Sequence, residues 1–220
     1  QATSMGVHES QSLFWENRVA RSKAFADRFW TYFVNEGAPL KNGLDLWQSM
    51  NPLLPGLNRV EADELSYGLH ILIRTDLEIA LLQEGLDVWD LPNEWNKRYA
   101  ELLGVTPAND SEGCLQDVHW SEGAFGYFPS YLLGHLISAQ LSEAMVSSLR
   151  QKGVKGEDPI GECIKDENET KLLQWLRDEV HHFGRQVNAE QLVKKVTGRD
   201  LSSDAFLNYL EKKLKMLMTS

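Results

Sequence analysis

Hydrophobic residues recur along most of this chain at intervals of three and four positions, the spacing that places them on one face of an α-helix. Between Leu13 and Phe33 they alternate in this way with charged residues, which predicts an amphipathic helix ending near Gly37. The same pattern predicts further helices over residues 62–83, 93–103, 130–149, 169–183, 188–197 and 203–217. No convincing stretch has the period of two that marks a β-strand, so the fold class is predicted to be mainly α.

Two stretches interrupt the helical pattern. Residues 51–58 contain two prolines and a glycine and are predicted to form a loop. Residues 106–129 form a longer loop, and loops of that length in compact domains are usually functional or mobile. This second loop brings together, within a dozen positions, an amide, a carboxylate, an imidazole, an indole and a phenol: Gln116, Asp117, His119, Trp120 and Tyr127. A ligand-binding loop and an aromatic loop that packs on itself are both open interpretations.

Length and charge restrict the kind of protein. A chain of 220 residues fits a single domain, and 42% hydrophobic residues are enough to form a packed core. The formal net charge of −10 repels nucleic acid and anionic membrane surfaces, so neither is an expected partner. Two widely separated cysteines, Cys114 and Cys163, form no metal or disulfide pattern, which favours a cytoplasmic protein.

One uncharged run has the length of a membrane span. Residues 123–142 lack Asp, Glu, Lys and Arg, but they contain glycines, a proline and several polar side chains. A buried loop followed by a helix inside a globular protein explains this composition better than a membrane span.

The predicted helix 62–83 carries a narrow polar stripe on an otherwise apolar surface. The stripe consists of residues three or four positions apart: Asp63, Tyr67, His70, Arg74 and Glu78. Two interpretations are open. Arg74 and Glu78, one turn apart, could form a structural ion pair. Alternatively, the stripe could line a cleft and present Arg74 to an anionic ligand, because a guanidinium binds a carboxylate through two hydrogen bonds.

A His8-Glu9 pair lies where the first predicted helix begins. A carboxylate is favoured there by the helix dipole alone, so a helix-start role competes with metal ligation. The pair is not part of a His-Glu-x-x-His motif, since Ser12 occupies the position of the second histidine.

Taken together, several short motifs in order resemble the M32 metallocarboxypeptidases, the carboxypeptidase Taq type. The motifs are His8-Glu9-Ser10-Gln11-Ser12, then Ile73-Arg74 with Glu78, then Gly113-x-x-Gln116-Asp117-x-His119-Trp120 followed by Phe125-Gly126-Tyr127-Phe128-Pro129. The likeness covers the chain from Gly6 to Leu217.

The resemblance implies a multi-helix, zincin-like metallopeptidase fold, with residues 1–220 as the C-terminal part of one catalytic domain. Family members carry His-Glu-x-x-His, with two zinc ligands and the general base, N-terminal to the His-Glu-Ser-Gln motif. By this resemblance Glu9 is the third zinc ligand. Substrate-binding roles are implied for Arg74, Gln116, Asp117 and His119, and Tyr127 is implied to face the developing oxyanion.

The function implied is a zinc metallocarboxypeptidase that releases single residues from peptides with a free C-terminus. The resemblance also implies a homodimer. With only one ligand present, the 220 residues alone are expected to bind zinc weakly and to be inactive. The alternative is a naturally short helical protein that binds peptides or has a structural role without catalysis. An in-frame His-Glu-x-x-His upstream of the codon for Gln1 would favour the enzyme.

Overall fold

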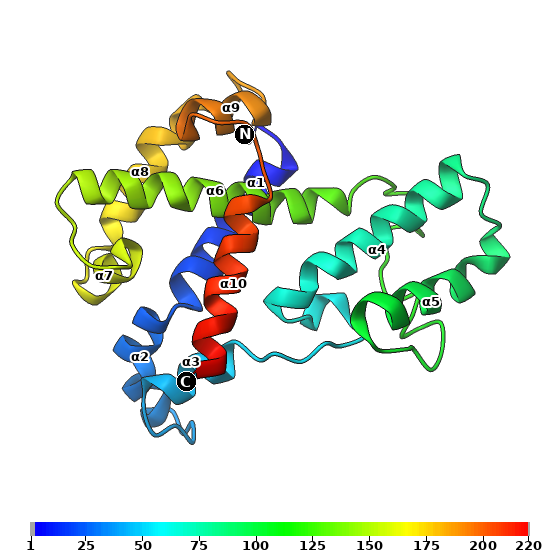
Figure 1. The fold of residues 1–220 in the computed structure, drawn as a ribbon, viewed down its shortest axis with the longest axis horizontal. Helices are drawn as coiled ribbons and strands as arrows, with labels where there is room; N and C mark the ends of the chain where they lie inside the picture. Colours follow the sequence, from blue (N-terminus) through cyan, green and yellow to red (C-terminus); the bar gives the residue numbers. More distant parts are fainter. Residues whose placement is uncertain (1–2, 220) are drawn as a thin grey trace. The chain divides into compact units, whose positions relative to one another are not determined.

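A computed structural model describes residues 3–219, and throughout that range the secondary structure is helical, with no β-strand (Figure 1). The predicted mainly α class is confirmed. In chain order the elements are α1 (Met5–Leu13), η1 (Phe14–Ala20), α2 (Lys23–Asn35), α3 (Gly43–Met50), η2 (Arg59–Glu61), α4 (Glu64–Gln83), η3 (Val88–Asp90), α5 (Leu91–Leu103), α6 (Pro129–Gln151), α7 (Pro159–Lys165), α8 (Glu169–Glu179), η4 (His181–Phe183), α9 (Ala189–Thr197) and α10 (Asp204–Thr219).

The chain divides into two compact units. The first combines Gln1–Asn51 with Leu133–Ser220, and the second consists of Pro52–Leu132. The division falls inside α6, whose first residues belong to the second unit. That residues 1–220 act as part of one catalytic domain stays a prediction.

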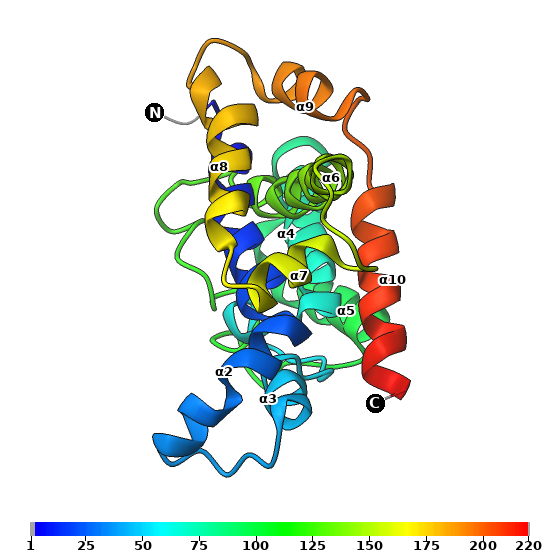
Figure 2. The same ribbon diagram turned by 90° about the vertical axis from the view of Figure 1, so that its left-hand side faces the viewer.

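The core of the first unit forms where α1, η1 and α6 pack with α7, α8 and α9 (Figure 2). Its most deeply buried apolar side chains come from segments far apart in the sequence: Phe14, Met145, Ile164, Leu172, Leu176, Leu192 and Val193. A second cluster joins α2 to α3 through Ala26, Leu46 and Trp47.

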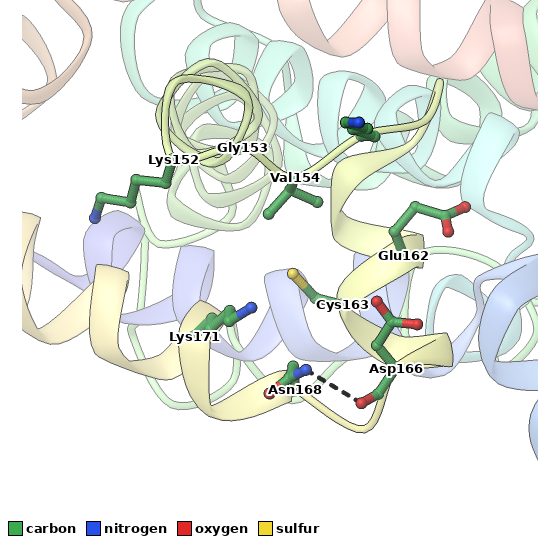
Figure 3. A pocket seen from close by; sticks show the side chains of 9 residues that line it. Lys152, Gly153, Val154, Glu162, Cys163, Asp166, Asn168 and Lys171 are labelled. Carbon is green, nitrogen blue, oxygen red and sulfur yellow. Dashed lines mark hydrogen bonds between the residues drawn. The ribbon is translucent and has the colours of Figure 1, made fainter.

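A cavity of about 310 Å³ lies in the first unit, beside α7 and the start of α8 (Figure 3). Its lining is polar, with Lys152, Lys171, Glu162 and Asp166 around the buried Cys163. Burial raises the pKa of the Cys163 thiol, so this thiol is neutral at pH 7. None of the predicted site residues lines this cavity.

The core of the second unit forms between α4 and α5. Trp95 and Tyr99 of α5 stack at 4.9 Å between ring centroids and pack against Ile73 and Leu77 of α4. Helix α4 begins where predicted, because the Asp63 carboxylate accepts a hydrogen bond from the Ser66 backbone N–H at 2.8 Å. Gly85 and Gly104 follow the ends of α4 and α5, and both have a positive φ.

The prediction of one continuous first helix is wrong, although its predicted end near Gly37 agrees with α2, which ends at Asn35. Helix α1 already begins at Met5, continues as the π-helix η1, and stops at Arg21. Ser22 then starts α2 as an N-cap, its hydroxyl accepting a hydrogen bond from the Phe25 N–H at 3.1 Å. Apolar spacing continued across this break, so the pattern alone did not reveal it.

Two short helices were not predicted. Helix α3 spans eight residues and is capped by Asn42, whose side chain accepts a hydrogen bond from the Asp45 N–H at 3.0 Å. Helix α7 spans seven residues and begins at Pro159. Proline is accommodated at the first position of a helix, because the N–H it lacks would have no helical partner there.

The uncharged run 123–142 becomes the end of the long loop and the first part of α6. Among residues 3–219, no helix has both the length and the apolar character needed to cross a membrane.

Candidate functional site

The polar stripe of α4 faces the interior of the second unit. Asp63, His70, Arg74 and Glu78 are all buried, and Arg74 has no exposed surface at all. The opposite side of the helix exposes apolar residues instead, with Leu72 44% and Ile79 40% exposed. Asp76 lies on this outer side and pairs with Arg98 of α5 at 3.3 Å. Helix α4 therefore presents the charged groups of its polar stripe inward, whereas Asp76 faces outward.

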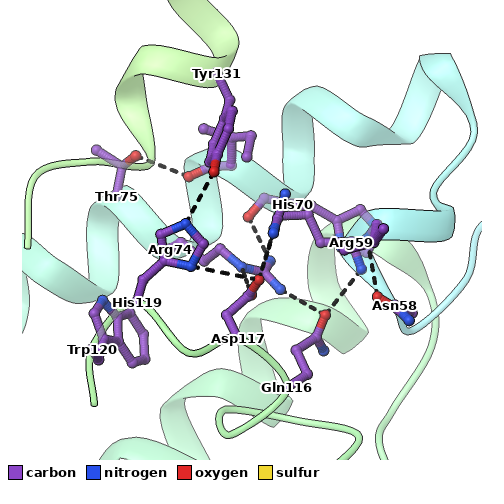
Figure 4. Close-up of polar contacts among 12 residues, drawn as sticks. Asn58, Arg59, His70, Arg74, Thr75, Gln116, Asp117, His119, Trp120 and Tyr131 are labelled. Carbon is purple, nitrogen blue, oxygen red and sulfur yellow. Dashed lines mark hydrogen bonds and ion pairs between the residues drawn. The ribbon is translucent and has the colours of Figure 1, made fainter. Parts of the chain in front are cut away.

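Arg74 meets a carboxylate from the long loop, and a second arginine binds the same group (Figure 4). The Arg74 Nε donates to Asp117 Oδ2 at 2.7 Å. Arg59, from η2, donates to Asp117 Oδ1 through Nε at 2.9 Å and through Nη2 at 2.7 Å. Asp117 thus holds two guanidinium groups, one on each oxygen.

Gln116 ties the same arginines to the loop. Its Oε1 accepts hydrogen bonds from Arg74 Nη2 at 2.7 Å and from the Arg59 backbone N–H at 2.9 Å. Its Nε2 donates to the backbone carbonyls of Leu57 at 3.0 Å and Glu112 at 2.8 Å. The amide therefore has all its hydrogen-bonding capacity satisfied, which fixes its orientation.

Protein acceptors take four of the five N–H donors of Arg74. Besides Asp117 and Gln116, its Nη1 donates to the His70 carbonyl at 2.8 Å and to the Tyr99 hydroxyl at 3.2 Å. Its guanidinium also lies over the Trp95 ring, 4.6 Å from the ring centroid. Because Arg74 has no exposed surface, a substrate could bind it directly only if the surrounding side chains moved.

The predicted alternative of an Arg74–Glu78 pair is wrong. Glu78 binds the loop instead, accepting from Trp120 Nε1 at 2.8 Å and from the Gly126 N–H at 3.0 Å. The reason is geometric, because Asp117 offers Arg74 a closer carboxylate from outside the helix. Each acidic group therefore anchors a different part of the long loop to α4.

The cluster of Arg59, Arg74 and Asp117 carries a surplus positive charge. Arginine stays protonated in proteins, so two cations face one anion. Burial acts to raise the pKa of Asp117, but the hydrogen bond from Arg59 and the charge of Arg74 outweigh it and hold the pKa below its usual range. Asp117 is ionised at neutral pH, and the cluster has one net positive charge.

His119 and Tyr127 lie beside this cluster. The His119 Nδ1 is 3.9 Å from Asp117 Oδ1, and its Nε2 is 3.1 Å from the Tyr131 hydroxyl. Its ring packs 4.3 Å from the Phe128 centroid and 5.5 Å from that of Tyr127. Burial lowers the pKa of His119 although Asp117 opposes this, so the ring is neutral at pH 7. The structure thus brings the predicted Arg74, Gln116, Asp117, His119 and Tyr127 into one unit.

His70 is a buried neutral histidine next to the cluster. Its Nδ1 lies 3.0 Å from the Tyr99 hydroxyl, while its Nε2 has no partner among the described residues. Burial, together with the charge of Arg74, lowers the pKa of His70 to about 4.

Glu9 lies in the first unit, in the second turn of α1. The helix begins at Met5 with Ser4 as its cap, and its first turn contains no acidic residue. The predicted alternative of a helix-start carboxylate is therefore wrong, because the dipole effect is confined to the terminal turn. Glu9 Oε2 accepts a hydrogen bond from Ser12 Oγ at 3.4 Å, and no ion pair to Glu9 occurs between residues 3 and 219.

Comparison with known proteins decides the family. The profile of the carboxypeptidase Taq (M32) metallopeptidases matches residues 1–214. The chain belongs to this family. It is 42% identical to thermostable carboxypeptidase 1 of Thermus thermophilus over 98% of the chain and 41% of that protein. It is 40% identical to carboxypeptidase 1 of Bacillus subtilis over 97% of the chain and 42% of that protein.

The fold agrees with the sequence match. The crystal structure of an M32 carboxypeptidase from Deinococcus radiodurans superimposes with a TM-score of 0.90 at 32% identity, covering 100% of the chain and 43% of that structure. The chain thus spans less than half the length of these M32 relatives. The helical metallopeptidase fold inferred from the motifs is confirmed.

Within the M32 family, Glu9 suits the role of one metal ligand. Carboxylate oxygens are among the ligands that bind zinc in proteins. The Glu9 carboxylate forms no ion pair in the part of the chain that the structure describes. That part contains no group of three His, Cys, Asp or Glu side chains that could hold a metal ion by itself.

The sequence pattern did not indicate Arg59 or Tyr99 as site residues. Arg59 follows the proline-containing loop and belongs to a single helical turn, where neither periodicity nor spacing marks a residue as buried. Tyr99 occupies an apolar position of α5, and its hydroxyl accepts a hydrogen bond from Arg74 Nη1 at 3.2 Å. No sequence signal marked either residue, because Glu78, one turn along α4, already offered Arg74 a local partner.

We predict that Asp117→Asn destabilises the second unit strongly. The substitution leaves two buried guanidinium groups without their shared anion, which typically costs about 3–5 kcal/mol of unfolding free energy. Asp76→Asn, which removes an exposed ion pair, is the matched control and should cost less than about 1 kcal/mol. Chemical denaturation of both variants measures the difference, and equal losses would contradict the buried cluster.

We predict that His70 makes stability sensitive to mild acid. Its folded pKa of about 4 lies below the ordinary 6.5, so the unfolded chain takes up the proton first as the pH falls. The His70 contribution is complete above pH 6.5 and disappears towards pH 4, a change on the order of 3 kcal/mol.

His70→Asn keeps a polar group near Tyr99 without a titrating ring, and it should flatten the decline in melting temperature over this pH window. His182→Asn, at an exposed histidine, is the control and should leave the decline unchanged. An unchanged slope in His70→Asn would refute the assignment.

Proposed function

We propose that these 220 residues form part of a metallocarboxypeptidase that releases single residues from peptides with a free C-terminus. The observation that carries the proposal is the net positive charge of the buried cluster of Arg59, Arg74 and Asp117, in a member of a metallopeptidase family. An exopeptidase of this type must bind the terminal carboxylate of its substrate, and a surplus guanidinium charge matches that group.

Arg59 is the better candidate to contact that carboxylate. Its side chain keeps 10% of its surface exposed, whereas that of Arg74 has none. Arg59 Nη1 has only a long contact, 3.5 Å to the Tyr67 hydroxyl, so it can still donate to a ligand. Arg74, expected from the sequence to clamp the substrate, instead positions Asp117 and Gln116, which in turn hold Arg59.

The remaining residues are assigned by their positions around Arg59. His119 and Gln116 line the substrate pocket, with His119 contributing a neutral ring beside Asp117. Tyr127 is half-buried, and its hydroxyl has no hydrogen bond within the described residues, so it can donate to an oxygen that gains negative charge during peptide hydrolysis.

Glu9 is proposed as one ligand of a zinc ion, with the other two ligands and the general base outside these 220 residues. When bound, zinc would supply a water of pKa roughly 7 as the nucleophile. One carboxylate cannot hold the ion, so the 220 residues alone are expected to bind zinc weakly. A homodimer and a cytoplasmic location remain predictions from the family resemblance and the composition.

We predict that Glu9→Gln removes metal and activity together in the intact protein. Glutamine preserves the shape but removes the negative charge, and zinc affinity should fall by roughly 100-fold or more, above the 10–100-fold typical of indirect effects. Glu16→Gln, at a carboxylate paired with Arg21 at 2.7 Å, is the control and should retain the metal. Stoichiometric zinc in Glu9→Gln would refute the ligand assignment.

We predict that Arg59→Ala discriminates between substrates with free and amidated C-termini. For free C-termini, kcat/KM should fall by an amount equivalent to about 2–4 kcal/mol, because a charge-assisted pair is lost. Amidated peptides should already be poor substrates and should lose little more.

Arg98→Ala, at a partly exposed arginine, is the control and should affect neither substrate. Arg74→Ala should lower the melting temperature and reduce activity on both substrates, as a positioning residue would. Equal losses on both substrates in Arg59→Ala would overturn the carboxylate assignment.

A further inference from the structure

A glycine of α6 lies directly against Glu9. A Cβ added at Gly134 would lie 2.7 Å from the Glu9 Cβ, 3.1 Å from Leu13 Cδ1 and 3.4 Å from the Glu9 carbonyl carbon. Contacts between real Cβ atoms essentially never fall below 3.0 Å. Helix α1 therefore approaches α6 so closely at Glu9 that a Cβ at position 134 fits only if Glu9 or one of the helices shifts.

The backbone conformation of Gly134 does not explain this choice of residue. Gly134 has no positive φ and lies within a helix, where glycine is less favourable than alanine by about 1 kcal/mol. Close packing against Glu9 is therefore the feature of the structure that requires glycine at this position.

Helix α1 is held in place on its other sides as well. Val7 and Phe14 are buried in the core of the first unit, and the Gln11 side chain lies 2.9 Å from His181 Nε2. The Ser12 hydroxyl donates to the Glu9 carbonyl at 2.9 Å and lies within 3.4 Å of its carboxylate. The distance between Glu9 and the backbone of α6 is therefore set by the size of residue 134.

We propose that Gly134 is a positioning residue for the metal ligand Glu9, an inference that rests on the proposed function. Alanine at position 134 would force the Glu9 Cβ outward by about 0.7 Å to reach the 3.4 Å of ordinary van der Waals contact. Metal–ligand distances tolerate deviations of about 0.2 Å. The displacement therefore exceeds what the coordination of a metal ion accepts, although the fold itself can adjust.

A glycine elsewhere in the first unit provides a matched control. A Cβ at Gly43 would lie 2.6 Å from the Asp27 Cα, in the packing of α3 against α2. Gly43→Ala therefore introduces a comparable backbone clash in a different helix pair. It should lower stability without changing metal affinity.

The experiment compares the intact protein with its Gly134→Ala, Gly43→Ala and Glu9→Gln variants. Zinc affinity is measured by competition with a chromogenic chelator, and coordination geometry by the visible absorption of the cobalt-substituted protein. The melting temperature of the metal-free protein reports on folding. Gly134→Ala should weaken zinc binding by about 10–100-fold, the range for residues that orient a ligand, and should change the cobalt spectrum.

Normal zinc affinity and a wild-type cobalt spectrum in Gly134→Ala would overturn the proposal, provided that Glu9→Gln loses the metal. If Glu9→Gln also keeps the metal, the ligand assignment itself fails, and with it the proposed role of Gly134. If Gly134→Ala does not fold, Gly134→Ala with Leu13→Ala carries the test. This double variant removes the Leu13 contact, keeps the contact with Glu9, and should show the same loss of zinc affinity.

Discussion

The second unit depends on one carboxylate that binds two guanidinium groups. Asp117 accepts three hydrogen bonds from Arg59 and Arg74, and all three groups are almost entirely removed from solvent. Such burial is tolerable only because each charge faces an opposite one with good geometry. The same contacts fasten the part of the long loop around Asp117 to α4.

The fold was predictable where helices were long and their ends were marked. Helices α4 and α5 agree with the predicted ranges 62–83 and 93–103. The break at Ser22 was not predictable, because a hydrogen-bonding cap interrupts the helix without interrupting the apolar spacing. Short helices such as α3 contain too few turns for a period to emerge, and their stability comes from tertiary packing.

Most members of the site were predictable from the sequence, with Arg59 and Tyr99 as exceptions, but the pairings between them were not. Polar residues at helical spacing correctly indicated that Arg74 belongs to a stripe, yet local spacing suggested Glu78 as its partner. The actual partner, Asp117, is 43 positions away, and it also recruits Arg59 from a segment without any pattern. Sequence spacing describes neighbours within one helix, whereas a buried charge is balanced by whichever group the tertiary fold brings closest.

A double-mutant cycle between Arg74 and Asp117 tests the shared carboxylate most directly. Arg74→Met, Asp117→Asn and the double variant are compared with the wild type in free energy of unfolding. If Asp117 balances Arg74, the two substitutions should be strongly non-additive, with an interaction energy of about 2–3 kcal/mol. Additivity within about 0.5 kcal/mol would show that the two residues do not depend on each other and would contradict the account of the cluster.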